Sequence, residues 1–270
     1  MKFRFGITGA TGSLGKNLIQ ILPKKNFNIY NGDIRSKVNV EKWIKNHKFE
    51  TVIHLAAVVP IKTVNQNKKK AFDVNFKGTK YLVDVLVNSD VKWFFFASTS
   101  HVYKSSRNKI AENSLKRPIS YYGKTKLLAE NYIIKKFKYS NKKFCIGRIF
   151  STSNIKQKKN YLVPDLINKT KKTKSYLTFK NLNHYRDFIS MVEISKIILS
   201  LYKKKFCGII NIGRGEGILL KDIAKLICEK FKKKYKIIDN KKITYLVANN
   251  KKLKKYFRFN KKTNLEKLIF

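Results

Sequence analysis

The sequence is poor in cysteine and contains no long apolar run. Its three cysteines in 270 residues are widely spaced and odd in number, so neither a disulfide framework nor a zinc site is expected, and the thiols are predicted to be buried. The apolar run at residues 93–97 is far too short to cross a bilayer. The opening residues lack the apolar core of a signal peptide. These absences predict a cytoplasmic protein with no membrane partner.

Acidic residues and arginine are also scarce. The 61 basic residues outnumber 16 acidic ones and give a formal net charge of +45, which on its own suggests nucleic acid or an anionic surface as partner. However, only eight of the 61 are Arg, the residue that best reads phosphates and base edges. Lys shares A/T-rich codons with the abundant Asn, Ile, Phe and Tyr, so a nucleotide bias explains the composition. Nucleic acid is therefore not expected as a partner, although a positive field would steer an anionic substrate.

Strands and helices alternate along the first half of the chain. Apolar periodicity predicts strands at residues 2–8, 27–30, 51–57, 92–98 and 144–149, and helices at residues 13–22, 38–48, 70–88 and 120–138. The short connections between them predict an α/β fold with a doubly wound parallel sheet of the Rossmann type. Later the pattern loosens, with helices predicted at 163–172, 190–202 and 220–231, a strand at 208–212, and a basic tail.

A glycine-rich segment lies between the first strand and the first helix. Gly9 permits a tight turn, Gly12 lets the backbone approach a pyrophosphate, and Gly15 lets the helix pack on the strand. The helix N-terminus adds unpaired N–H groups and a partial positive charge. We therefore predict that a dinucleotide contacts the following residues: Gly9, Thr11, Gly12, Ser13, Leu14 and Gly15.

These elements divide the chain into two predicted parts. Residues 1–150 are expected to form a dinucleotide-binding domain, to which later segments at about 183–213 return. Residues 151–270 are expected to form a smaller, mainly substrate-binding part that packs over the carboxyl ends of the strands, where such sheets bind ligands.

Tyr122 stands four residues before Lys126 in a predicted helix, so both side chains share one face. A free phenol, with a pKa near ~10, is a poor base at neutral pH. A neighbouring ammonium favours the phenolate and brings the group into working range. The pair alone is a weak signal, because Lys and Tyr are common in this chain, but it follows a complete glycine motif.

The glycine spacing behind Thr8 resembles the extended short-chain dehydrogenase/reductase superfamily, in particular the NAD-dependent epimerase/dehydratase family. Further segments match that family in the same order along the chain: residues 52–57, 75–79, 96–103, 122–126, 186–189 and 211–215. The resemblance covers nearly the whole chain. It implies an oxidoreductase or epimerase that transfers a hydride at a sugar carbon of a nucleotide-linked sugar, with NAD or NADP as cofactor.

The resemblance also implies roles for individual residues. Thr99 and Tyr122 would hydrogen-bond the reacting oxygen, and Lys126 would hold the cofactor ribose and tune Tyr122. The remaining implied cofactor contacts are Leu55, Ala56, Ala57 and Asn75, and the implied substrate contacts are Ser100, Ser151 and Arg186. Arg148 is either a phosphate contact or a structural ion pair. The histidines have no metal-ligand spacing, so no metal site is predicted.

The stretch between Gly15 and Thr51 is short for a dinucleotide fold and has room for only one strand and one helix. That strand must lie beside the first one, and its end would deliver Asp33 to the adenosine ribose. A carboxylate there repels a 2′-phosphate, which favours NAD, whereas Arg35 leaves NADP open. In a second interpretation, residues 32–35, with Ile34, correspond to the family's later adenine-contacting motif.

The residues after Thr99 bear on the reaction. The family's 4,6-dehydratases follow the catalytic Thr with Asp-Glu, whereas this chain has Ser100 and His101, which favours an epimerase or a ketoreductase. The sequence does not distinguish these two. The alternatives are a nucleotide-sugar 4,6-dehydratase, a non-catalytic NAD(P)-binding protein and, last, a basic nucleic-acid-binding protein. The resemblance further implies a homodimer formed through the helices at 70–88 and 120–138.

Overall fold

The structure is a computed structural model that describes residues 4–59, 61–153, 161–173, 176–239 and 243–260 and positions 266 and 269. Backbone contacts divide the chain into two compact units. The first unit comprises Met1–Lys104, Leu115–Ile149 and Val192–Ile210, and the second comprises Ser105–Ser114, Phe150–Met191 and Asn211–Phe270. Each unit is described by itself.

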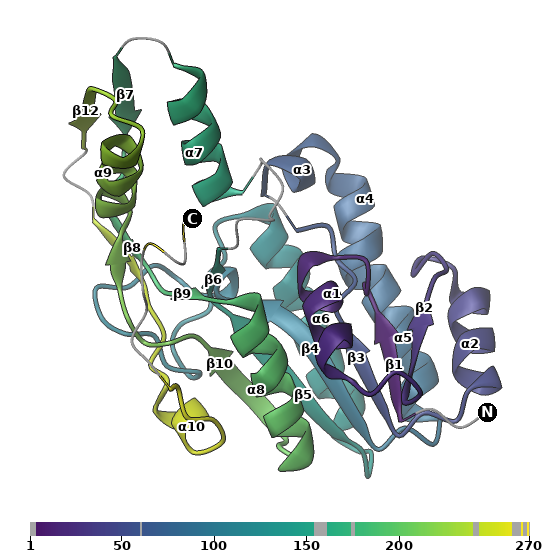
Figure 1. Cartoon of the computed structure of the whole chain (residues 1–270). Helices are drawn as coiled ribbons and strands as arrows, with labels where there is room; N and C mark the ends of the chain where they lie inside the picture. Colours follow the sequence, from purple (N-terminus) through teal and green to yellow (C-terminus); the bar gives the residue numbers. More distant parts are fainter. Residues whose placement is uncertain are drawn as a thin grey trace. The chain divides into compact units, whose positions relative to one another are not determined.

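A six-stranded sheet forms the centre of the first unit (Figure 1), in the order β10-β5-β4-β3-β1-β2. Its strands are β1 (Phe5–Thr8), β2 (Phe27–Tyr30), β3 (Thr51–His54), β4 (Trp93–Thr99), β5 (Lys143–Ile149) and β10 (Gly208–Ile212). The pairs β1–β2, β1–β3, β3–β4 and β4–β5 are all parallel. The predicted Rossmann-type fold is therefore confirmed, and β2 lies beside β1 as its position in the chain required.

Helices connect these strands and cover both faces of the sheet. They are α1 (Ser13–Ile21), α2 (Lys37–Asn46), α3 (Ile61–Gln66), α4 (Lys68–Phe72), the π-helix η1 (Asp73–Gly78), α5 (Thr79–Val87), the 3₁₀ turn η2 (Ser100–Val102), α6 (Tyr121–Phe137) and α8 (Met191–Lys203). In β4, Phe94 and Phe96 join a buried cluster with side chains of α2, α5 and α6. The neighbouring Trp93 instead contacts the Tyr202 ring of α8, with centroids 5.7 Å apart. Successive residues thus face two helical layers, which explains the continuous apolar run.

Two predicted elements of this unit differ in extent. The helix predicted at 70–88 is interrupted, since α4 and α5 are separated by the π-helix η1. The strand predicted at 51–57 ends at His54. The two departures are in contact, since Asn75 of η1 is hydrogen-bonded to Val58 in the segment that follows β3.

The second unit contains short strands that the periodicity did not reveal. They are β6 (Ser151–Thr152), β7 (Leu177–Lys180), β8 (His184–Arg186), β9 (Phe188–Ile189), β11 (Ile218–Leu219), β12 (Tyr235–Ile238) and β13 (Thr244–Leu246). They form the groupings β11-β8-β13, β12-β7 and β6-β9. The helices are α7 (Leu162–Lys172), α9 (Leu220–Lys230) and α10 (Lys251–Lys254), and α7 and α9 share a buried apolar cluster. Most of the predicted basic tail lies outside the described residues.

The three cysteines differ in their exposure. Cys145 and Cys228 are buried as predicted, but Cys207 is exposed, so the expectation of buried thiols is wrong for that residue, which immediately precedes the edge strand β10.

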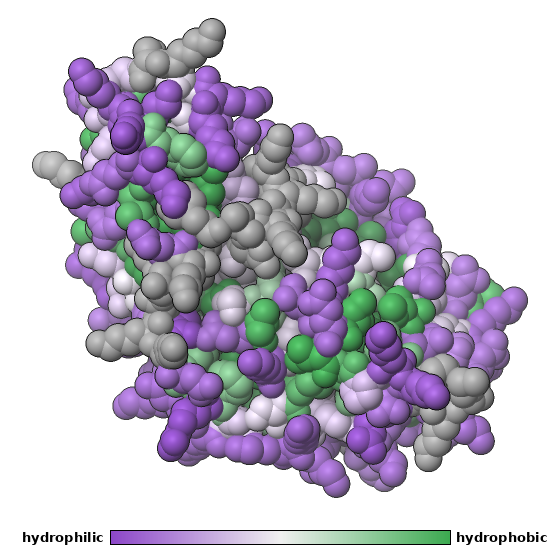
Figure 2. Space-filling view, viewed as in Figure 1, coloured by the Kyte–Doolittle hydropathy of each residue, from purple (hydrophilic) through white to green (hydrophobic). Residues whose placement is uncertain are grey.

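Figure 2 shows hydrophilic side chains spread over the face in view instead of gathered over one element. No helix within the described ranges is both long and apolar enough to cross a membrane.

Candidate active site

The turn between β1 and α1 is packed too closely for side chains. Gly9 has a φ of +72°, and a Cβ there would lie 2.5 Å from the backbone nitrogen of Ala56. A Cβ on Gly15 would lie 2.4 Å from the carbonyl oxygen of Gly9. Helix α1 begins at Ser13 behind Gly12, with no side-chain cap and no acid in its first turn. Its N–H groups and positive dipole end therefore suit a pyrophosphate, so the residues of this turn fit the predicted dinucleotide.

Buried polar side chains form a hydrogen-bonded chain beside this turn, and we call it the histidine network: Thr8, His54, Thr79, Asn75 and Thr125. His54 Nδ1 lies 2.6 Å from Thr8 Oγ1, and His54 Nε2 lies 2.9 Å from Thr79 Oγ1. Thr79 Oγ1 donates its only hydrogen to the Asn75 carbonyl, so it accepts from Nε2–H. In a neutral His54, Nδ1 is then the acceptor for the Thr8 hydroxyl. Burial, helped by the Lys126 charge, lowers the pKa of His54 to about 3.

Asn75 joins the histidine network to two parts of the site. Its side chain accepts from the Val58 N–H at 2.8 Å and donates to the Val58 carbonyl at 3.1 Å. It also donates to Thr125 Oγ1, which donates to the Tyr122 carbonyl. Beyond His54 the N–H groups of Ala56 and Val58 donate to the side chains of Thr8 and Asn75 instead of to a neighbouring strand. A π-helix, such as the one that contains Asn75, is frequent at functional sites. Asn75 thus fixes the loop that contains Leu55, Ala56 and Ala57 against α6.

Asp33 follows β2 and lies in an open hollow of about 410 Å³, lined by Asp33, Arg35, Ser36, Asp73, Lys77 and Tyr81. Both oxygens of Asp33 accept from Arg35 Nε, at 3.0 and 2.9 Å. Hydrogen bonds from Arg35 hold the pKa of Asp33 below its usual range. The neighbouring Ile34 is buried, and a Cβ on Gly78 would lie 2.8 Å from its Cγ2. The structure therefore exposes the Asp33 carboxylate as the NAD hypothesis requires, already paired with Arg35.

The strand end at Thr99 lies against the start of α6. Thr99 Oγ1 accepts from the His101 N–H at 3.2 Å and so caps the turn η2, in which Ser100 is 1% exposed. A Cβ on Gly123 would lie 2.3 Å from the His101 carbonyl oxygen. The rings of His101 and Tyr122 are 6.1 Å apart in an edge-on contact. The structure thus brings the Thr99 turn and Tyr122 together, and it is the absence of a side chain at Gly123 that permits the approach.

Helix α6 positions Tyr122 and Lys126 one turn apart. The helix begins behind Ser120, whose hydroxyl accepts from the Gly123 N–H at 3.1 Å, a cap that contributes about 1 kcal/mol. Tyr122 is 7% exposed and packs in a small cluster with Val64 of α3. Tyr122 and Lys126 are therefore two buried residues of one helix, four positions apart.

Lys126 is buried, with 2% of its surface exposed. Its Nζ lies 3.9 Å from the centroid of the Phe96 ring, a cation–π contact. Burial lowers the pKa of Lys126 to about 7, against the opposing charge of Glu130. A lysine in this range changes its charge near neutral pH, which is typical of functional sites.

A buried ion pair beside Lys126 was only partly foreseen. The side chains of Glu130 and Arg148 are 1% and 0% exposed, and Glu130 Oε2 lies 2.7 Å from Arg148 Nη2. Of the two interpretations of Arg148, the structure supports the structural ion pair, because its guanidinium donates to Glu130 and to Tyr103. Ser98 donates to Glu130, and Arg148 donates to Tyr103. We call Ser98, Tyr103, Glu130 and Arg148 the ion-pair network. The sequence analysis named Arg148 as a possible member of an ion pair, and the Glu four residues after Lys126 was the available signal for its partner.

The remaining predicted substrate contacts, Ser151 and Arg186, belong to the second unit. Ser151 starts β6, and Arg186 ends β8, where its Nη1 donates to Thr244 Oγ1 at 3.1 Å. Sequence analysis missed the role of Asp187, whose carboxylate accepts from the N–H groups of Arg214, Gly215 and Ala248. Burial raises the pKa of Asp187 to about 6. The matching segments at 186–189 and 211–215 are therefore in direct contact within this unit.

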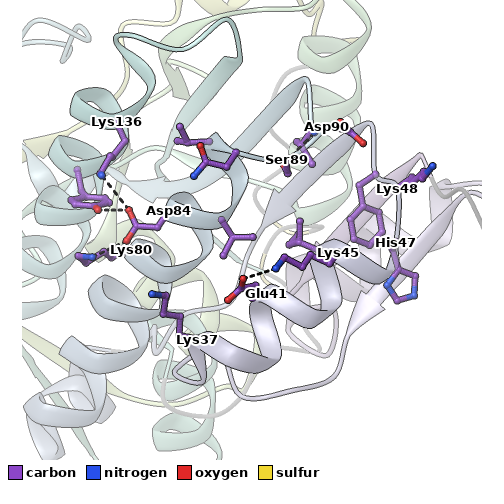
Figure 3. A pocket seen from close by; sticks show the side chains of 17 residues that line it. Lys37, Glu41, Lys45, His47, Lys48, Lys80, Asp84, Ser89, Asp90 and Lys136 are labelled. Atoms are coloured by element: carbon purple, nitrogen blue, oxygen red, sulfur yellow. Dashed lines mark hydrogen bonds and ion pairs between the residues drawn. The ribbon is translucent and has the colours of Figure 1, made fainter.

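A groove of about 810 Å³ lies elsewhere in the first unit, over the outer faces of α2, α5 and α6. In Figure 3, Glu41 pairs with Lys45, and Asp84 faces Lys136. None of the predicted site residues lines it, so it is separate from the candidate active site. In the part of the chain that the structure describes, no three His, Cys, Asp or Glu residues are grouped as metal ligands.

Comparison with known proteins agrees with this geometry. The model of the NAD-dependent epimerase/dehydratase family matches residues 6–213, and the chain therefore belongs to that family. NAD as the predicted cofactor agrees with this membership.

Individual relatives are similar over most of the chain. GDP-6-deoxy-D-talose 4-dehydrogenase of Aggregatibacter actinomycetemcomitans is 29% identical over 83% of this chain and 78% of its own length. dTDP-D-glucose 4,6-dehydratase of Dictyostelium discoideum is 29% identical over 78% of this chain, which spans 52% of that relative. The fold matches a UDP-glucuronic acid 4-epimerase variant from Bacillus cereus, solved with a substrate analogue and NAD, at a TM-score of 0.86 and 21% identity, covering 100% of this chain and 96% of the other.

Proposed function

We propose that this protein is an NAD-dependent epimerase or ketoreductase that acts on a nucleotide-linked sugar. The observation that carries the proposal is the arrangement on α6: Tyr122 stands one turn from the buried Lys126 and against the turn that Thr99 caps. A non-catalytic cofactor-binding protein would have no need to bury a lysine beside a tyrosine at this place.

Each of the three residues has a distinct proposed role. Tyr122 takes the proton from the sugar hydroxyl during oxidation and returns it to the ketone oxygen during reduction. Thr99 hydrogen-bonds the same oxygen and holds it in reach of Tyr122. Protonated Lys126 favours the Tyr122 phenolate. In this proposal the two groups titrate in coupled steps, so a measured pH dependence belongs to the pair and not to either residue.

The cofactor role rests on the glycine turn and on Asp33. NAD, when bound, supplies the hydride acceptor or donor for the sugar carbon. The N-terminus of α1 would hold its pyrophosphate, and Asp33 would accept from the adenosine ribose hydroxyls. We propose NAD as the preferred form because a carboxylate repels a 2′-phosphate, while the partner Arg35 makes that preference moderate.

The proposed reaction is oxidation or reduction at carbon 4 of the sugar without loss of water. The relatives named above are a 4-dehydrogenase, a 4,6-dehydratase and a 4-epimerase, so their names share this carbon. In place of the Asp-Glu pair expected of a dehydratase, this chain has Ser100 and His101. Ser100 is buried and His101 is neutral or cationic, so neither supplies the carboxylates for elimination.

The test is a cofactor titration followed by turnover. Wild-type protein and Tyr122→Phe are titrated calorimetrically with NAD⁺, NADH and NADPH and then assayed with a panel of UDP-, GDP- and dTDP-linked sugars and their 4-ketones. We expect both proteins to bind NAD with similar affinity, and the variant to lose about 10²–10⁴-fold in kcat, the usual contribution of a general acid–base group. A 4-epimer as product identifies an epimerase, and net consumption of NADH identifies a ketoreductase. Failure of the wild type to bind any dinucleotide at low salt would refute the proposal.

A further inference from the structure

The ion-pair network contains a buried ion pair that stability alone does not explain. Arg148 Nη2 and Nε donate to Glu130 Oε2 at 2.7 and 3.2 Å, and Nε also donates to Oε1 at 3.1 Å. Although burial opposes it, hydrogen bonding to Glu130 raises the pKa of Arg148. Removing two charges from water costs about as much as their attraction returns, so buried pairs are weak evidence of stabilisation. Another reason for the pair is therefore needed.

Each partner of the pair also holds a neighbour. Glu130 Oε1 accepts from the Ser98 hydroxyl. Arg148 Nη1 donates to the Tyr103 hydroxyl at 2.8 Å, and the guanidinium carbon lies 4.8 Å from the centroid of the Tyr103 ring. All four side chains are buried and bonded to one another, so we treat them as one unit.

The network borders the catalytic residues on every element that carries one. Ser98 directly precedes Thr99 on β4 and stands opposite Arg148 of β5 in the strand register. Tyr103 directly follows η2, the turn that Thr99 caps. Glu130 lies one turn beyond Lys126 on α6. The four side chains therefore connect β4, β5, the turn and the helix at one point.

We propose that Ser98, Tyr103, Glu130 and Arg148 are positioning residues that hold Thr99 and Lys126 in their working arrangement and keep Lys126 cationic. This inference rests on the proposed function, because it assigns these residues a role in the same reaction.

The charges around Lys126 indicate the direction of the effect. Glu130, on the same helix, favours its cation. His54 of β3 is neutral, and Phe96 of β4 offers only its ring face. Loss of the Glu130 charge would favour neutral Lys126, and without the ammonium Tyr122 would keep its proton to higher pH.

The first test uses small changes that leave the pair intact. Tyr103→Phe removes only the hydroxyl that Arg148 holds, and Ser98→Ala removes only the donor to Glu130. We expect each to lower kcat about tenfold, since small misplacements of reacting groups have large effects, with the KM for the sugar within twofold of wild type. Tyr202→Phe is the matched control: it too deletes a tyrosine hydroxyl bound to a charged side chain, here the Glu50 carboxylate at 2.7 Å, but Glu50 directly precedes β3, away from the strand end that carries Thr99. It should keep the wild-type kcat.

The second test removes the charge. Glu130→Gln is compared with the double variant Glu130→Gln/Arg148→Met, in which the Arg148 guanidinium is not left buried without its carboxylate, so the double variant is expected to retain the fold if the single variant does not. We expect the acid limb of the rate profile for sugar oxidation to move up by about one pH unit in either folded variant. The deprotonation of Tyr122, followed as the difference in phenolate absorbance between each protein and its Tyr122→Phe counterpart, should move in the same direction.

The outcomes separate this inference from the proposed function. Wild-type kcat and an unchanged acid limb in Tyr103→Phe, Ser98→Ala and the double variant would overturn it, even if those variants unfold more readily, because a purely structural network would show that result. If the wild type turns over no sugar, the proposed function fails, and the absorbance titration still decides: an unchanged Tyr122 transition overturns the inference, and a shifted one supports the coupling.

Discussion

Two buried polar networks border helix α6, and they differ in charge. The histidine network is neutral, since each of its donors meets an acceptor and His54 carries no charge. The ion-pair network contains a full carboxylate and a full guanidinium. A neutral network depends on matching donors and acceptors, so the loss of one member costs one or two hydrogen bonds. A charged network depends on charge balance as well, so the loss of one member leaves an uncompensated ion.

Lys126 lies between the two networks and responds to both. Its charge contributes to keeping His54 neutral, while Glu130 favours its cation against the effect of burial. Burial and Glu130 therefore act in opposite directions on the charge of Lys126, the residue that we propose tunes Tyr122. The predictions below test this contrast in order of the expected effect.

The largest effect is expected from Glu130→Ala. It leaves Arg148 buried without its carboxylate, so we expect a loss of about 3–5 kcal/mol in the free energy of unfolding. Urea unfolding followed by circular dichroism measures it. The double variant Glu130→Gln/Arg148→Met should recover most of the loss, because the Arg148 guanidinium is then no longer buried without its carboxylate. If Glu130→Ala were as stable as wild type, water or another group would have to compensate the Arg148 charge, and the ion-pair network would not depend on charge balance.

Replacing Lys126 should increase the free energy of unfolding, whereas Glu130→Ala should decrease it. The pKa of Lys126 is lowered to about 7 by burial, so the folded protein gives up a proton that the unfolded chain keeps, and stability rises as pH increases from about 7 towards the ordinary lysine value. Lys126→Met removes the cost of burying the lysine charge. We expect the free energy of unfolding to increase by roughly 2–4 kcal/mol at pH 7 and turnover to be lost. Unfolding measured at several pH values should show the wild-type rise and a flatter variant. A destabilised Lys126→Met would contradict this account of the site.

A smaller, pH-dependent effect is expected from His54→Gln. The pKa of His54 is lowered to about 3, so between pH 6.5 and 3 the unfolded chain binds a proton that the folded chain does not. The contribution of His54 to the stability of the folded protein is therefore complete above about pH 6.5 and is lost as the pH falls from 6.5 to 3. The variant should be less stable than wild type by about 1–2 kcal/mol at pH 7, and the difference should narrow as the solution is acidified. A constant difference from pH 7 to pH 4 would argue against a neutral, buried His54.

The smallest effect is expected from Thr125→Val, which removes the hydroxyl that links Asn75 to the Tyr122 carbonyl. We expect a loss of about 1 kcal/mol in the free energy of unfolding and a modest fall in kcat. Thr125→Ser keeps the hydroxyl and should behave as wild type in both assays. A loss as large as that of Glu130→Ala would remove the distinction between the two networks.

The fold of the first unit could be predicted from the sequence because its signals are local. The apolar strands, the glycine turn and the Ser120 cap each lie within a few consecutive residues, and the short span before Thr51 left β2 only one place, beside β1. The second unit was predicted less completely. Its strands β6, β9 and β11 have only two residues each, too few to show a period.

The site was predicted in part for the same reason. Tyr122 and Lys126 are four residues apart, so their shared face follows from helix geometry. The contacts of Asn75 and of Arg148 join residues 17 and 18 positions away, and the register that brings them together exists only once the sheet forms. The cytoplasmic location, the homodimer and the individual roles of the site residues stay predictions.

The most direct test of the account is the titration of Tyr122 in two backgrounds. The phenolate absorbance of wild-type protein minus Tyr122→Phe is compared with that of Lys126→Met minus Lys126→Met/Tyr122→Phe, each over a range of pH. If Lys126 activates Tyr122, the tyrosine loses its proton at lower pH in the presence of the lysine than in its absence. The same transition in both backgrounds would show that the two residues do not work as a pair, and the proposed mechanism would be wrong.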